Sequence, residues 1–148
     1  MPGTRAVLDT NAWLDWLVFD DASMQPLRRA LARDELEIVV DANCEQELIL
    51  VLAYPALALD ATAQARSLAQ LRAHARRVDP APAAGAPLPR CRDADDQKFL
   101  ELACRARAGW LITRDKALLR LDRHRLKPPG LRIATAGAFA AACAALPA

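Results

Sequence analysis

Short apolar runs alternate with longer amphipathic segments along almost the whole chain. The runs predict β-strands over residues 5–9, 37–40, 76–79, 110–113 and 131–134, of which 76–79 has the weakest pattern. The segments between them predict helices over residues 11–18, 24–33, 43–53, 61–74, 93–107, 116–122 and 135–145. This alternation is typical of a parallel sheet with helices on both faces. We therefore expect an α/β fold: a single three-layer α/β/α domain over residues 1–148, with a central parallel sheet of about five strands.

Polar and proline-rich stretches mark where the elements begin and end. Asp41 and Asp60 directly precede two of the predicted helices, where a carboxylate is suited to cap free backbone N–H groups. Pro55 ends the helix over 43–53. Residues 80–90 hold four prolines and one glycine, which indicates a loop within the domain rather than a domain boundary.

The composition of the 148 residues, 53% of them hydrophobic, fits a soluble globular class. Apolar runs such as residues 48–53 are too short to cross a bilayer. The start of the chain leads directly into a strand-like run, so no secretory signal is expected. The four cysteines form neither a C-x-x-C pair nor a cluster with histidine, which argues against zinc and for reduced thiols. We expect a cytoplasmic protein without membrane association.

Charge changes this picture because it is unevenly spread. Residues 1–60 carry four arginines and eleven acidic residues, for a net charge of −7. Residues 90–148 carry twelve basic and six acidic residues, for a net charge of +6. An acidic centre beside an arginine-rich half suits a nucleic-acid substrate. A general bias of composition toward alanine and arginine explains the same numbers equally well.

Two aspartates, Asp9 and Asp115, each follow an apolar strand-like run, and they lie far apart in the sequence. In a parallel sheet, ligands bind outside the carboxyl ends of the strands, where the strand order reverses. Both acids are therefore candidates for one pocket, and grouped carboxylates suit a hard divalent cation. A second interpretation is that each acid simply caps the helix that follows it.

Further acids stand on the predicted helices. Asp93, Asp95 and Asp96 crowd one helix start, where the helix dipole favours negative charge, so a capping cluster is one interpretation. Asp96 differs because at helical spacing it aligns with apolar residues expected to face the sheet: Phe99, Leu100 and Ala103. A buried carboxylate needs a partner, and we favour a metal ion over Arg114 or Lys116.

Glu45 and Glu47 flank the apolar stripe of the helix over 43–53, so periodicity alone does not choose between them. Exposure to solvent is the simpler interpretation of either glutamate, and more so of Glu45.

Four blocks in this order resemble the PIN-domain family of metal-dependent ribonucleases. The blocks are Leu8-Asp9-Thr10-Asn11, Glu47-Leu48 with Val51-Leu52, Asp93-Ala94-Asp95-Asp96 with residues 99–103, and Leu111-Ile112-Thr113-Arg114-Asp115 with Leu118-Leu119. The resemblance covers nearly the whole chain. It is greatest to the branch of toxin components of bacterial toxin–antitoxin pairs, the VapC-like ribonucleases.

This resemblance implies an acidic quartet of Asp9, Glu47, Asp96 and Asp115 that is catalytic and binds metal. It further implies supporting roles for Asn11 and Thr113, and Asp93 is kept as a supporting or metal-contacting residue. Carboxylates are hard ligands, so the expected cofactor is Mg²⁺ or Mn²⁺ and the expected reaction is hydrolysis of RNA phosphodiester bonds.

The resemblance also implies partners: an RNA substrate, a cognate antitoxin protein and a homodimer. Candidates for contacts with the RNA backbone are Arg114, Lys116 and the cluster of Arg120, Arg123 and Arg125, although a solvated helix face explains Arg123 and Arg125 at least as well. The aromatic residues Trp13, Trp16 and Tyr54 are candidates for an exposed antitoxin groove, and burial in the core is the competing fate for at least one tryptophan.

Two other classes of protein remain open. A haloacid-dehalogenase-like phosphatase would use Asp9 as its nucleophile, but that family has a second aspartate where this chain has Asn11. A catalytically weak RNA-binding module would bind RNA without metal-dependent cleavage.

Overall fold

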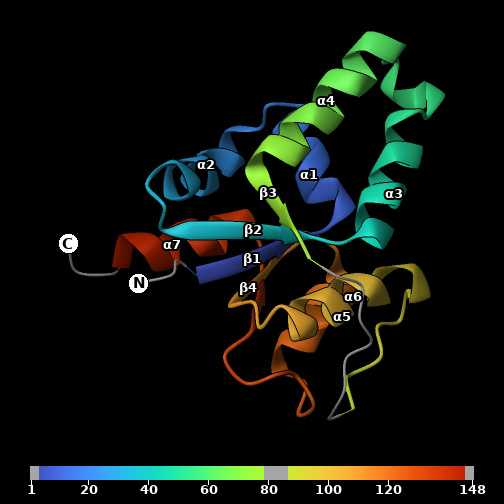
Figure 1. Cartoon of the computed structure of the whole chain (residues 1–148). Coiled ribbons are helices and arrows are strands. Elements are labelled where there is room, and N and C mark those ends of the chain that lie inside the picture. The colour runs from blue at the N-terminus through green and yellow to red at the C-terminus, as the bar shows by residue number, and fades with distance from the viewer. Residues whose placement is uncertain (1–3, 79–86, 146–148) are drawn as a thin grey trace.

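Five parallel strands form the sheet of the computed structural model, which describes residues 4–78 and 87–145 (Figure 1). The strands are β1 (Thr4–Leu8), β2 (Leu36–Val40), β3 (Ala75–Arg77), β4 (Trp110–Ile112) and β5 (Arg132–Ala134). Their order across the sheet is β3-β2-β1-β4-β5. This is the parallel α/β sheet that the sequence pattern predicts.

The strand order reverses between β1 and β4, which lie side by side at the centre of the sheet. Leu8 of β1 pairs with Ile112 of β4 in parallel register. The residues that follow these strands, Asp9 and Thr113, therefore emerge next to each other at one edge. This is the reversal point at which parallel sheets bind ligands.

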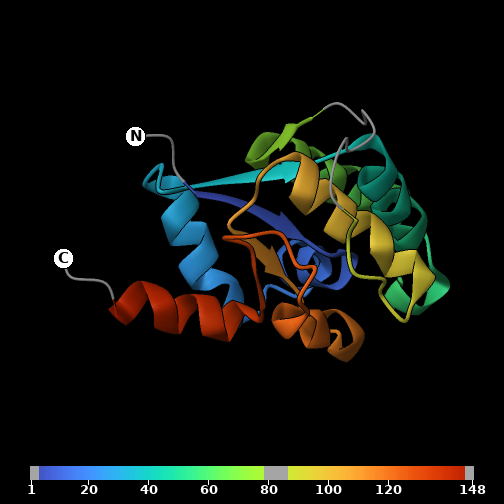
Figure 2. The ribbon, with the colours of Figure 1, turned by 90° about the horizontal axis from the view of Figure 1, so that it is seen from below.

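Seven α-helices lie in the described residues, with α1 to α4 on one face of the sheet and α5 and α6 on the other (Figure 1). They are α1 (Thr10–Leu17), α2 (Gln25–Ala32), α3 (Ala42–Leu52), α4 (Ala61–His74), α5 (Gln97–Arg105), α6 (Lys116–Leu119) and α7 (Ala136–Ala145). Helix α7 packs against α2 (Figure 2). The fold is thus the three-layer α/β/α arrangement that the sequence pattern predicts.

The described residues also contain four short 3₁₀ segments: η1 (Ala22–Met24), η2 (Pro55–Leu57), η3 (Ala94–Asp96) and η4 (Arg120–Arg123). Some of them change where the predicted helices begin and end. The helix predicted over 93–107 begins as η3 and becomes regular only at Gln97, and the helix over 116–122 divides into α6 and η4. Strand β3 ends at Arg77, and most of the predicted loop over 80–90 lies outside the described residues.

Aspartates cap the N-termini of four of the described α-helices: α1, α3, α4 and α6. Asp41 accepts a hydrogen bond from the Cys44 N–H at 2.9 Å, and Asp60 caps α4 in the same way. Asp9 caps α1 and Asp115 caps α6. The predictions for Asp41 and Asp60 are confirmed, and the capping interpretation of Asp9 and Asp115 is also correct.

The core includes both tryptophans of α1. Trp13 is 2% exposed and Trp16 is 3% exposed, so neither lines an exposed groove, and the competing expectation that at least one tryptophan is buried in the core is confirmed. The reason is that α1 contacts α3 and α4 as well as β1, and the Trp16 ring lies 5.3 Å from His74 of α4. Tyr54 is exposed, as predicted. Among the described residues, no helix is both long and apolar enough to span a bilayer.

Candidate metal centre

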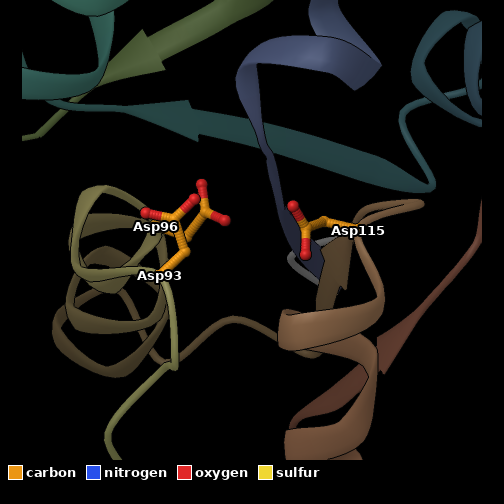
Figure 3. Close-up of side chains that lie close together, drawn as sticks. All are labelled: Asp93, Asp96 and Asp115. Atoms are coloured by element: carbon orange, nitrogen blue, oxygen red, sulfur yellow. The ribbon is translucent and has the colours of Figure 1, made fainter.

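Three aspartates from two distant parts of the chain gather at the carboxyl edge of the sheet. Asp93 precedes η3, Asp96 ends it, and Asp115 caps α6. Each offers one carboxylate oxygen, and the three oxygens lie within 4.8 Å of one another. The carboxylates of Asp93 and Asp96 face that of Asp115 across a narrow gap (Figure 3).

Asp96 carries the clearest sign of a missing partner. Its Oδ2 atom is buried and makes no hydrogen bond with any described residue. Burial, together with the negative charges of Asp115, Asp93 and Asp9, raises the pKa of Asp96 to about 7. A bound cation would satisfy the lone oxygen and relieve the repulsion between the acids.

The helical alignment that singled out Asp96 is confirmed, because Phe99, Leu100 and Ala103 are all buried. The alternative partners predicted for Asp96 do not reach it. Arg114 forms its ion pair with Asp15 instead, and Lys116 is exposed with no ion pair among the described residues. The remaining predicted partner for Asp96 is a metal ion.

Asp9 lies deeper than these three acids and is 3% exposed. Its Oδ1 accepts a hydrogen bond from the Ala12 N–H at 2.8 Å, and its Oδ2 accepts one from the Thr113 hydroxyl. The same Thr113 Oγ1 accepts the N–H of Asp115 at 3.0 Å. Burial raises the pKa of Asp9 despite these bonds. Thr113 therefore connects the acid that follows β1 to the acid that follows β4.

Glu47 lies apart from the three clustered aspartates. The Thr10 hydroxyl donates to its Oε2, and Lys98 forms an ion pair with its Oε1 at 2.9 Å. Burial lowers the pKa of Lys98, but its hydrogen bond to Glu47 and the nearby negative charges, Glu47 foremost, together raise the pKa by more, so Lys98 stays charged. The carboxylate of Glu47 is thus already neutralised, unlike that of Asp96.

The expectation that Glu45 is the more solvent-exposed of the two glutamates is wrong. Its side chain is only 5% exposed and forms ion pairs with Arg72 at 2.7 Å and Arg77 at 3.4 Å. Both arginines come from elements later in the chain, α4 and β3, which the pattern of α3 alone does not reveal.

The remaining predicted residues surround this edge. Asn11 is exposed, and its side chain makes no hydrogen bond to Asp9 among the described residues. Arg114 is held by Asp15 through two contacts of 3.1 Å, yet its side chain remains 62% exposed. Lys116 and Arg120 are exposed and line a shallow surface depression next to α6. Lys98, the partner of Glu47, and Asp15, the partner of Arg114, were not predicted. No local sequence signal distinguishes these two residues from other charged residues.

Oxygen donors without nitrogen or sulfur ligands, one of them unpartnered, fit a hard cation such as Mg²⁺ or Mn²⁺. A family model described as PIN domain matches residues 5–117, from β1 into α6. The chain belongs to the PIN-domain family. PIN domains are typically metal-dependent nucleases, so the acidic cluster of this PIN domain is a candidate metal site and nucleic acid its candidate substrate. No curated protein sequence matches the chain.

Proposed function

We propose that this PIN domain is an endoribonuclease that depends on Mg²⁺ or Mn²⁺. The observation that supports the proposal most strongly is the buried, unpartnered oxygen of Asp96 among three other acids. The buried acids Asp15, Asp41 and Glu45 each form an ion pair with an arginine, so a group of acids without a cationic partner favours a binding role.

In this proposal Asp93, Asp96 and Asp115 hold the cation. Thr113 keeps Asp9 pointed at the same edge. The family resemblance adds Glu47 of α3 to the site, although Lys98 already pairs with its carboxylate. A bound divalent ion supplies Lewis-acid stabilisation of the phosphate and lowers the pKa of water. The carboxylates must be ionised to bind it, so binding releases the proton of Asp96 near neutral pH.

The basic residues near α6 would orient the substrate. Arg114, Lys116 and Arg120 are exposed on the segment that begins beside Asp115. Contacts from such residues to backbone phosphates fix the register of a nucleic acid without reading its sequence. These contacts would bring a phosphodiester to the acids.

The test is cleavage of a single-stranded RNA in Mg²⁺ or Mn²⁺ by the wild type and by Asp9→Asn, Asp96→Asn and Asp115→Asn. Each variant is expected to lose at least about a thousandfold in rate, because several kcal/mol of charge stabilisation disappear. The matched control is Asp95→Asn, since Asp95 is an exposed neighbour outside the cluster. Equal activity in all variants would contradict the proposal.

Two other outcomes point to the alternative functions. RNA binding without cleavage in either metal, unchanged by Asp115→Asn, would favour the RNA-binding module. A trapped aspartyl-phosphate on Asp9 would favour the phosphatase, although both oxygens of Asp9 already accept hydrogen bonds.

The resemblance to VapC-like ribonucleases supports a narrower proposal: a cytoplasmic toxin that a cognate antitoxin holds inactive, with a homodimer as its assembly. Of the three aromatic residues considered for the antitoxin surface, only Tyr54 is exposed. Expression of the wild type is expected to arrest growth, and Asp96→Asn is expected to be harmless. Rescue by a short neighbouring reading frame would identify the antitoxin.

A further inference from the structure

A small pocket of about 130 Å³ lies beside the acidic centre, on the other side of Thr113. It is formed where α1, η1 and the end of β4 meet the beginning of α7. Thr113 belongs to both places, because it lines this pocket and donates its hydroxyl hydrogen to Asp9. A group bound in the pocket would therefore be a direct neighbour of the catalytic edge.

The pocket combines an apolar wall with a polar rim. Met24 and Ile112 contribute to the apolar wall, and Thr135 contributes a hydroxyl. Thr135 Oγ1 accepts the Ala138 N–H at 3.1 Å, and the described residues show no acceptor for its hydroxyl hydrogen. A flat ring with carbonyl oxygens on its edge matches this combination of surfaces.

The rim also carries a fixed guanidinium group. Both Arg114 Nε and Nη2 contact the carboxylate of Asp15 at 3.1 Å, so the group is held at two points. Burial raises the pKa of Asp15, and the charge of Arg114 opposes that increase. Because Arg114 remains 62% exposed, one face of its plane is free. Arginine planes of this kind stack on unpaired RNA bases.

We propose that this pocket binds the pyrimidine base of the nucleotide next to the phosphate that is cleaved. The proposal rests on the ribonuclease function and names the substrate preference of that site. The size favours one class of base: the volume of about 130 Å³ is close to the cavity of about 150 Å³ that holds one benzene ring, so it matches a single six-membered ring better than a fused purine. Arg114 stacks on the base, and the Thr135 hydroxyl donates to a base carbonyl.

The first test compares oligoadenosine RNAs that carry one uridine, one adenosine or one abasic residue at the same position. The wild type is expected to cut beside uridine roughly five- to tenfold faster than at the other two, the worth of one stacked base. Gly137→Leu should remove this difference, because a Cβ there would lie 3.8 Å from Thr135 Oγ1 on the pocket rim. Ala138→Leu, on the same exposed helical turn but outside the pocket, should keep it.

The second test measures binding in the absence of metal. Uridine monophosphate is expected to shift the amide NMR signals of Thr113, Thr135 and Gly137 in the wild type, and adenosine monophosphate is not. Cleavage without a pyrimidine preference would overturn the pocket assignment and leave the nuclease intact. Binding of uridine monophosphate by a protein that cuts no RNA would overturn the nuclease and retain the pocket. A preference that survives Gly137→Leu would also overturn the assignment.

Discussion

Asp41 and Asp115 occupy equivalent places in the fold and differ in what surrounds them. Asp41 follows β2 and caps α3, and Asp115 follows β4 and caps α6. Asp41 is buried against the guanidinium of Arg105, whereas Asp115 faces Asp93 and Asp96. A helix-capping aspartate after a strand thus serves a structural ion pair in one case and an uncompensated acidic cluster in the other.

The position of an acid at a strand end therefore does not decide its role. The role depends on the charge of the residues that surround the acid in the folded structure. Where arginine supplies the counter-charge, as for Asp41 and Glu45, the fold already satisfies the carboxylate. Where further aspartates supply more negative charge, as for Asp96, the pKa rises and a cation is needed.

Removal of the counter-charge of Asp41 should have the largest effect on stability. Arg105→Gln leaves a buried carboxylate without its cation and is expected to lower the free energy of unfolding by about 3 kcal/mol. Urea denaturation measures this loss, and Arg66→Gln on the exposed side of α4 is the control. An unchanged midpoint would mean that Asp41 does not depend on Arg105.

Loss of the hydrogen bonds that link Asp9 to Asp115 through Thr113 should have the next largest effect. Thr113→Val removes the hydroxyl that joins Asp9 to the N–H of Asp115. Loss of such a supporting hydrogen bond is expected to lower the rate of RNA cleavage by roughly 10- to 100-fold. Thr113→Ser, which keeps the hydroxyl, should restore most of the rate. If Val and Ser behave alike, the hydroxyl is not the link.

Neutralisation of Asp96 should stabilise the metal-free protein. Its pKa is raised from 3.8 to about 7 in the folded state, so the folded protein binds this proton more tightly than the unfolded chain does. Wild-type stability therefore falls as the pH rises from about 4 through 7, and Asp96→Asn removes that fall. At pH 8 in a chelator the variant should be more stable by about 1 kcal/mol, a value reduced for the partial exposure of the side chain. The difference should vanish near pH 4, as thermal unfolding at both pH values can show.

Glu45→Gln should have the smallest effect. The substitution removes a buried charge but leaves Arg72 and Arg77, both more than half exposed, free to be solvated by water. We expect a loss of about 1 kcal/mol or less in the free energy of unfolding, with RNA cleavage unchanged. Glu47→Gln is the matched variant, and it should impair cleavage. The reverse pattern would move the functional role from Glu47 to Glu45.

Local pattern was sufficient to predict the parallel sheet and the meeting of Asp9 and Asp115. Each strand is a distinct apolar run, and parallel strands end at a common edge. Asp9 and Asp115, which follow the neighbouring strands β1 and β4, are therefore expected near each other. The burial of the stripe below Asp96 also followed from helical periodicity. These features depend on residues close together in the sequence.

The features that the sequence did not reveal depend on distant partners. Glu45 is buried because Arg72 and Arg77 reach it from α4 and β3. Trp13 and Trp16 are buried because two helices cover α1 in addition to the sheet. No periodicity within one helix contains that information, because it arises only when the layers are assembled.

The acids around Asp96 need a cation that no described residue of the fold provides. Calorimetric titration of the metal-free protein with Mn²⁺ at pH 7, repeated in two buffers of different ionisation enthalpy, measures whether a metal ion fills this role. We predict binding to the wild type with release of protons, binding at least about tenfold weaker to Asp96→Asn, and unchanged binding to Glu45→Gln. Equal affinity of the wild type and Asp96→Asn would contradict the account.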